Sequence, residues 1–159
     1  MFIDASALTA LLTDEEEARE LLARLQQTGT RLTSPLAVWE AAVAVARVLD
    51  LSVSAAAEAI EEYLALMEIA VVAVPSETAR LALFAFDRFG KGRHPASLNF
   101  GDCFAYACAR HLGQPLMFKG GDFPHAERAA AESLAIPIYG ELTSVQQEMV
   151  AGAIAEFVS

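Results

Sequence analysis

The sequence predicts an α/β fold in which a mainly parallel sheet is flanked by helices. Short apolar runs alternate with segments of helical periodicity along the whole chain, which is the order that parallel sheets require. The run 68–74 is rich in β-branched residues and ends at Pro75, as expected of a buried parallel strand. The segment 98–110 repeats apolar residues every three or four positions, as a helix with one buried face does.

The first half of the chain begins with a strand and continues with capped helices. Residues 1–3 form an apolar run that ends at Asp4. Residues 13–16 have the pattern of a capping box, which predicts a helix from there to about Gln27 with the acidic run 14–17 in solvent. Ser34 before Pro35 predicts the start of the next helix. The remaining predictions are a strand at 30–33, a helix from Ser34 to about Leu49 with Val38, Ala41, Ala42, Val45 and Leu49 on its apolar side, and a helix from Ser54 to about Leu66.

The second half repeats the alternation of strand and helix and ends in a helical extension. Its predicted elements are the strand 68–74, a helix from Ser76 to about Phe89, a basic loop 90–95, the helix beginning near Leu98 with Phe100, Cys103, Phe104, Ala107 and Cys108 on one face, a strand 115–118, a turn 119–122, a helix 127–134, a strand 136–138 and a last helix 143–157. We expect residues 1–138 to form one domain and residues 139–159 to be a C-terminal helical extension packed on the same domain.

Composition and charge restrict the classes of protein. At 159 residues, with 55% hydrophobic residues, the chain can bury the core of one domain. No apolar run reaches the 18 or so residues of a membrane span, and no secretory signal is visible, which predicts a cytoplasmic protein with Cys103 and Cys108 reduced. The net charge of −10 disfavours non-specific binding to nucleic acid. Work on a polyanion would therefore need a local basic patch or a divalent cation.

Four acidic residues are expected to meet at one edge of the sheet. Asp4 and Asp122 follow strands, Asp102 opens a helix, and Glu40 lies on a helix that follows a strand. Ligands of parallel sheets bind at the carboxyl ends of the strands. Packed carboxylates raise each other's pKa unless a cation neutralises them, and oxygen ligands favour Mg²⁺ or Mn²⁺. These features predict metal-assisted hydrolysis of a phosphodiester.

Each of these acids also has a purely structural interpretation. Asp4 could cap the first helix, Glu40 could pair with an arginine, Asp102 could cap its helix or stabilise the helix dipole, and Asp122 could be a turn residue. Taken together, four such coincidences are a weaker explanation than one shared site.

The chain resembles the PIN-domain ribonucleases, specifically the VapC-type toxins of toxin–antitoxin pairs. The matching segments are residues 1–8, Trp39-Glu40, residues 94–103 with the Asn-Phe-Gly-Asp-Cys motif, and residues 118–123. The resemblance implies a three-layer α/β/α sandwich and an Mg²⁺-dependent endoribonuclease. Its metal-binding and catalytic residues would be Asp4, Glu40, Asp102 and Asp122, with Ser6 and Asn99 as polar neighbours. It further implies an RNA substrate, a VapB-like antitoxin and a homodimer. The chain departs from the family pattern at Gly121 and at residues 124–126.

Basic residues near the acidic site are candidates for holding RNA phosphates. Lys91, Arg93 and His94 precede the helix of Asp102, and Lys119 precedes Asp122. The other interpretation of residues 91–94 is an ordinary solvated loop. The apolar stripe of the last helix indicates packing on the body of the protein or on a second copy, or occupation of the antitoxin groove.

Two other functions remain open at this point. The first is an aspartyl-phosphate phosphohydrolase of the haloacid dehalogenase type, with Asp4 as nucleophile, Lys119 as its cation and Asp122 on Mg²⁺. That family needs a second acid two residues after the nucleophile, and Ser6 stands there. The second is a non-catalytic binding module with the same fold.

Overall fold

A four-stranded parallel sheet lies at the centre of the computed structural model, which describes residues 1–119. The strands are β1 (Phe2–Ile3), β2 (Leu32–Thr33), β3 (Ala70–Val71) and β4 (Leu116–Met117). Their order is β3-β2-β1-β4, with Phe2 opposite both Leu32 and Leu116. All three pairings are parallel, so the predicted sheet is confirmed. The carboxyl ends of the strands therefore meet at one edge, where a site can form.

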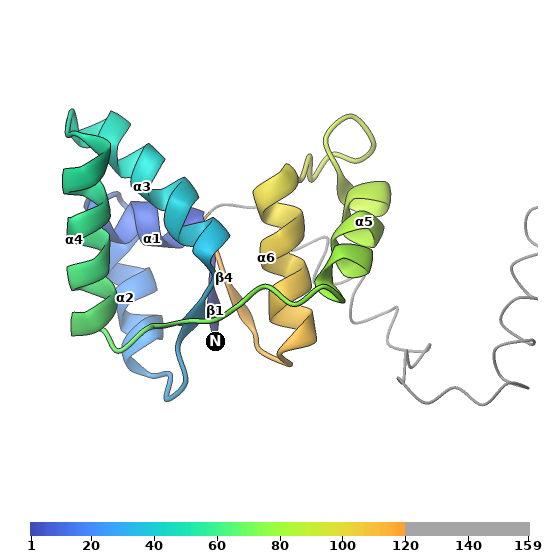
Figure 1. The fold of residues 1–159 in the computed structure, drawn as a ribbon, viewed down its shortest axis with the longest axis horizontal. Helices are drawn as coiled ribbons and strands as arrows, with labels where there is room; N and C mark the ends of the chain where they lie inside the picture. Colours follow the sequence, from blue (N-terminus) through green and yellow to red (C-terminus); the bar gives the residue numbers. More distant parts are fainter. Residues whose placement is uncertain (120–159) are drawn as a thin grey trace, which may run out of the picture. The chain divides into compact units, whose positions relative to one another are not determined.

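Six helices of the described part cover the two faces of this sheet. They are α1 (Ala5–Leu12), α2 (Ala18–Gln26), α3 (Pro35–Leu49), α4 (Val53–Leu66), α5 (Thr78–Phe89) and α6 (Phe100–His111). In Figure 1, α1 to α4 lie on one side of the strands, and α5 and α6 lie on the other. This arrangement is the predicted α/β/α sandwich. Among residues 1–119, no helix has both the length and the apolar character needed to cross a membrane.

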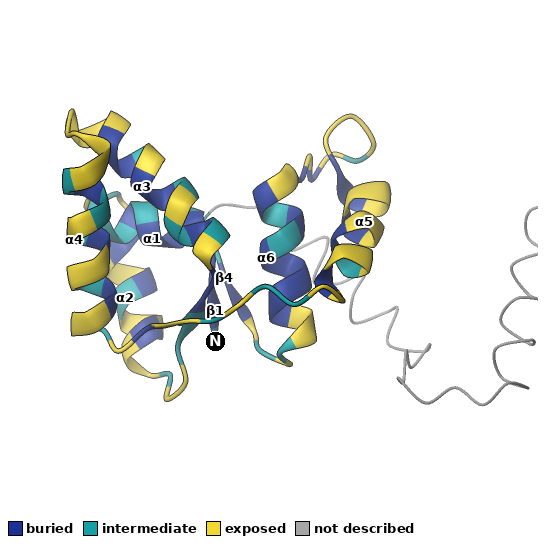
Figure 2. Cartoon of the chain, viewed as in Figure 1, coloured by how far each residue is buried: buried dark blue, intermediate teal, exposed yellow. Residues whose placement is uncertain are grey.

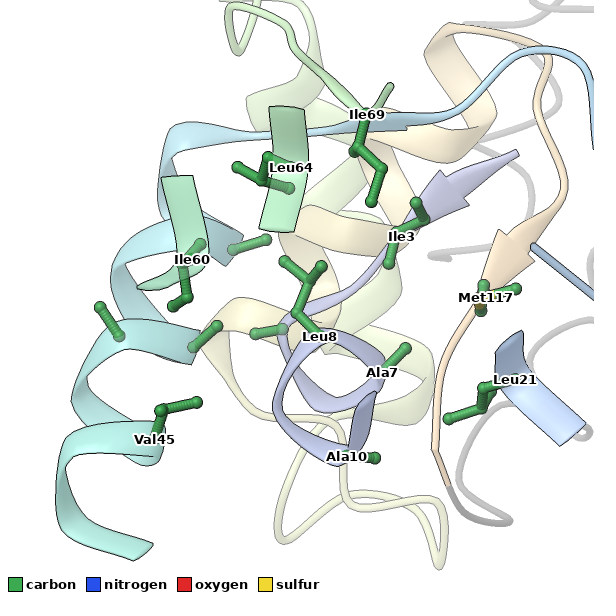
Figure 3. Close-up of a cluster of buried hydrophobic side chains, with 14 of the residues drawn as sticks. Ile3, Ala7, Leu8, Ala10, Leu21, Val45, Ile60, Leu64, Ile69 and Met117 are labelled. Atoms are coloured by element: carbon green, nitrogen blue, oxygen red, sulfur yellow. The ribbon is translucent and has the colours of Figure 1, made fainter. Parts of the chain in front are cut away.

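The principal core lies between the sheet and the first four helices. Figure 3 shows Ile3 of β1, Leu8 of α1, Val45 of α3 and Ile60 of α4 converging there. These four side chains are at most 1% exposed. Burying a side chain of this size contributes about 1.5–3 kcal/mol to stability. On the other face, α6 is mostly buried while the outer side of α5 is exposed (Figure 2). The core thus fixes β1 and α3 relative to each other, and both carry candidate site residues.

The start of the second helix differs from the predicted capping box. Residues 5–12, for which no bounds were predicted, form α1. Thr13 ends that helix, and its hydroxyl donates to the Thr9 carbonyl at 2.9 Å instead of capping a new helix. Asp14 adopts a left-handed φ of 50°, and α2 begins only at Ala18. The acidic run 14–17 is therefore a turn between two helices.

Other differences concern caps and exposed faces. Helix α4 begins at Val53, with Ser52 as its cap, rather than at Ser54. Helix α5 begins at Thr78, so Ser76 is not its N-cap; Glu77 holds that position and makes no capping hydrogen bond with its side chain. The predicted strand 68–74 shortens to β3, whose two residues are exposed because β3 is an edge strand of the described sheet. Leu49 and Phe100, predicted to be buried, are 46% and 65% exposed at the ends of their helices.

Several predictions agree closely with the structure. Helix α3 spans the predicted residues, and its Ser34 hydroxyl accepts the Ala37 N–H at 3.2 Å. Cys103 and Cys108 are free thiols, as predicted. The predictions for Asp122, Gly121, residues 124–126, the helix 127–134, the strand 136–138, the boundary at 138 and the extension 139–159 lie outside the described residues.

Candidate functional site

Three of the four predicted acids lie around one cavity. Asp4 follows β1, Glu40 is in the second turn of α3, and Asp102 is in the first turn of α6. The cavity has a volume of about 290 Å³. Its lining residues are Asp4, Ala5, Ser6, Thr9, Glu15, Glu40, Ala44, Asn99, Asp102 and Lys119. Acids separated by up to 98 positions in the sequence are thus brought together by the parallel sheet and the helices that follow its strands.

Asp4 is held in place by the backbone of two strands and by Ser6. Its N–H donates to the Met117 carbonyl at 2.9 Å, which ties the end of β1 to β4. Its Oδ2 accepts the Ser6 N–H at 3.0 Å and the Ser6 hydroxyl at 2.6 Å. With 3% exposure, Asp4 is a buried acid. The structural interpretation, a cap on α1, is therefore correct, and Asp4 lines the cavity as well. Ser6 lies directly beside it, as the resemblance implied.

Asp102 is positioned by a capping box at the start of α6. Its N–H donates to Asn99 Oδ1 at 3.1 Å, and its Oδ2 accepts the Asn99 N–H at 2.7 Å. The two residues therefore fix each other's side chains at the N-terminus of the helix, where an anion is stabilised by the helix dipole. Asn99 is thus a polar neighbour of Asp102, as the resemblance implied.

Glu40 faces the start of α6 across a glycine. A methyl group built on Gly101 would overlap both carboxylate oxygens of Glu40, so only a glycine allows this approach. Burial raises the pKa of Glu40, and the negative charges of Asp4 and Asp102 raise it further. The charges of Asp4 and Asp102 therefore act on the Glu40 carboxyl, as expected of carboxylates in one site.

Two polar residues of the cavity wall, Thr9 and Glu15, were not predicted to belong to the site. Glu15 is half-buried and forms an ion pair with Lys119, whereas the acidic run was predicted to be solvated. Within that run, nothing in the sequence distinguishes Glu15 from Glu16. Only the tertiary structure distinguishes it, because the turn between α1 and α2 brings Glu15, and Glu17 behind it, to the Lys119 ammonium at the end of β4.

Of the four basic candidates, only Lys119 lines the cavity. Arg93 pairs with Asp87 at 2.7 Å and stacks over the ring of Phe86. His94 packs edge-on against Phe89, and its Nδ1 accepts the Ala96 N–H. Lys91 is exposed in the same loop. The basic loop is therefore an ordered turn beside α5 and α6.

The donor chemistry of the cavity fits a hard divalent cation. The carboxylates of Asp4, Glu40 and Asp102 are the oxygen ligands that Mg²⁺ prefers. Within residues 1–119, no group of three His, Cys, Asp or Glu side chains lies close enough to enclose a metal. Mg²⁺ does not need such a cage, because it keeps several waters and binds through one or two carboxylates. These acids therefore suit a partly hydrated ion.

Comparison with known proteins identifies the family. The sequence profile of the PIN domain matches residues 1–129. The class of protein defined by this fold and acidic cavity is therefore the PIN domain.

Curated relatives place the chain more closely. It is 39% identical to ribonuclease VapC30 of Mycobacterium tuberculosis over 137 residues, which cover 81% of this chain and 96% of the relative. It is 40% identical to a ribonuclease VapC of Mycolicibacterium smegmatis, over 82% of this chain and 98% of that one. A VapC ribonuclease of Rhizobium meliloti is 35% identical, over 79% of this chain and 97% of the relative. Within the PIN domains, the chain belongs to the VapC ribonuclease family.

A solved structure supports the fold. The crystal structure of Mycobacterium tuberculosis VapC20, described as a toxin that cleaves the sarcin-ricin loop, superimposes with a TM-score of 0.63. The superposition covers 79% of this chain and 93% of the VapC20 chain, and the two sequences are 20% identical. The predicted architecture is thus confirmed by a relative whose sequence has diverged widely.

Proposed function

We propose that this protein is a divalent-metal-dependent endoribonuclease that acts as the toxin of a toxin–antitoxin pair. The observation that carries the proposal is the meeting of Asp4, Glu40 and Asp102 at one cavity, in a chain of the VapC family. The cation is Mg²⁺ or Mn²⁺, because the available ligands are carboxylate oxygens. When bound, such a cation activates water and stabilises the charge that develops at a phosphodiester.

The residues around the cavity have distinct tasks in this proposal. Asp4 and Asp102 hold the metal, and the hydrogen bonds from Ser6 and Asn99 keep their carboxylates oriented. Glu40 and Asp122 complete the acidic site, bind the metal directly or through water, and orient the attacking water.

The proposal extends to the substrate and partners, and the family assignment supports it there. Lys119 contacts a phosphate of the RNA at the cavity, and Lys91, Arg93 and His94 extend the path of the RNA along the adjacent loop. A VapB-like antitoxin would inhibit the enzyme, which would act in the cytoplasm as a homodimer. The two departures from the family pattern, at Gly121 and at residues 124–126, alter only the surroundings of Asp122 in this proposal.

The decisive experiment combines two substrates with two variants. The purified chain is incubated with RNA or with a generic phosphomonoester, in Mg²⁺ or in EDTA. We expect cleavage of RNA only, dependent on Mg²⁺, and a loss of at least about a hundredfold in Asp102→Asn. Asp50→Asn, which removes the same charge at an exposed helix end, should cleave like the unaltered protein. Hydrolysis of the phosphomonoester would indicate the dehalogenase-type reaction instead, and activity in neither assay would indicate a binding module.

A further inference from the structure

A lysine and two acids form an ion-pair group at the wall of the cavity. The Lys119 ammonium pairs with Glu15 Oε2, and Glu17 Oε2 lies 4.0 Å from the same nitrogen. The other oxygen of Glu15 accepts the Thr13 hydroxyl at 3.3 Å. The side chains of Lys119 and Glu15 are only 34% and 28% exposed. Their pairing is thus less screened by solvent than a surface ion pair.

Lys119 is anchored next to the predicted metal ligands. Its backbone N–H donates to the Ser6 hydroxyl oxygen at 3.0 Å, and that hydroxyl in turn donates to Asp4 Oδ2. Lys119 is also the one cationic residue among the described residues that line the cavity. Its flexible four-carbon side chain therefore starts beside Asp4, in a cavity that also contains Glu40 and Asp102.

Such an ammonium is a potential competitor of a metal ion. Three carboxylates in one cavity attract any cation, and a lysine already tethered to the cavity has a high effective concentration there. If the ammonium settled among Asp4, Glu40 and Asp102, a divalent cation would have to displace it before binding. A counter-charge elsewhere on the wall would prevent this.

We propose that Glu15 is a positioning residue that holds the Lys119 ammonium away from Asp4, Glu40 and Asp102, so that these acids stay open to the divalent cation. Glu17 supports Glu15 in this task from 4.0 Å. The turn that presents both acids depends on the left-handed conformation of Asp14. The inference rests on the metal-binding role of the cavity in the proposed function, but not on cleavage of RNA.

The test is a double-mutant cycle on metal affinity, measured by calorimetric titration of the metal-free protein with Mn²⁺. We expect Glu15→Gln to weaken binding about tenfold, the usual scale for residues that orient a metal site from outside it. Glu16→Gln removes the same charge from an exposed neighbour and should leave the affinity unchanged. In a Lys119→Gln background, Glu15→Gln should have no effect, because the competing ammonium is gone.

The outcomes separate this inference from its alternatives. An equal loss of affinity in both backgrounds would overturn it, since Glu15 would then act on the metal by its own charge or as a ligand. An unchanged affinity in Glu15→Gln would overturn it as well. Circular dichroism of each variant verifies that the fold is intact. If the protein binds Mn²⁺ as described here but cleaves no RNA, the proposed function fails while this inference stands.

Discussion

Glu40 is the acid whose ionisation the site disfavours. Burial, followed by the charges of Asp4 and Asp102, raises its pKa from the ordinary value of 4.5. Folded protein therefore binds a proton at Glu40 more readily than unfolded protein does. Between the ordinary and the raised pKa, the folded state carries more protons, so the free energy of unfolding decreases as pH rises through that window. At neutral pH, the ionised Glu40 therefore destabilises the folded, metal-free protein.

Removing this charge should stabilise the metal-free protein. We expect Glu40→Gln to raise the melting temperature at pH 7.5 in EDTA. The gain should shrink as the pH falls toward 4.5, because the folded unaltered protein then increasingly carries Glu40 in its neutral form. Thermal unfolding followed by circular dichroism at several pH values measures this. Glu61→Gln, on the exposed face of α4, is the control and should show no such dependence on pH. A gain that is constant with pH would contradict the electrostatic explanation.

Single residues also show how far sequence reasoning reaches. Asp4, Glu40 and Asp102 could be selected because the first follows a predicted strand, the second lies on a helix that follows a strand and the third opens a helix. Parallel sheets gather such positions at one edge. Glu15 could not be selected, since its neighbours in the run 14–17 have the same charge. Only the path of the turn distinguishes it. The exposure of Phe100 was likewise invisible, because helical spacing does not reveal where a helix end leaves the core.

At the scale of elements, the contact between α3 and α6 shapes the cavity. Gly101 lets the start of α6 approach the Glu40 carboxylate on α3. The bounds of α3 were predictable from the Ser34-Pro35 cap, and those of α6 from its apolar spacing. The weak point was β3, whose β-branched run predicted a long buried strand. Its composition could not reveal that it lies at the edge of the described sheet, where pairing with one neighbour leaves it short.

A methyl group at this contact should disturb the site more than the fold. We expect Gly101→Ala to lower the rate of RNA cleavage by about a hundredfold, because Glu40 must move and displacements of about 1 Å can cost that much. Helix propensity favours alanine, which limits the loss of stability. Gly29→Ala is a matched control, since a methyl group there meets no atom. The measurement is the initial rate of RNA cleavage with Mg²⁺. An unimpaired Gly101→Ala enzyme would show that activity does not need the close approach of Gly101 to the Glu40 carboxylate.

At the scale of the whole molecule, charge couples metal binding to stability. The chain carries a net charge of −10, and several of its acids line one cavity. Any ligand that binds only the folded state stabilises it, by about 2.7 kcal/mol at a hundredfold excess over its dissociation constant. A divalent cation at the cavity should therefore raise the melting temperature beyond the general effect of salt on an acidic protein.

Metal removal should accordingly destabilise the protein. We expect Mn²⁺ to raise the melting temperature above that measured in EDTA with NaCl of equal ionic strength, which corrects for screening. In the double variant Asp4→Asn/Asp102→Asn, the melting temperature should be the same in Mn²⁺ as in EDTA with NaCl. Differential scanning calorimetry provides the measurement. An equal shift in the double variant would place the bound metal elsewhere on this acidic surface.

The hydrogen-bonded series that joins Lys119 to Ser6 and Ser6 to Asp4 has a consequence for biosynthesis. The first strand can reach its neighbour β4 only after residue 117 has been synthesised, and contacts of such large sequence separation form late in folding. Until residue 119 has been synthesised, the nascent chain therefore lacks the contacts that hold Asp4 in the site. For an enzyme that degrades RNA, assembly in this order delays its destructive capacity until the segment that carries β4 has been synthesised.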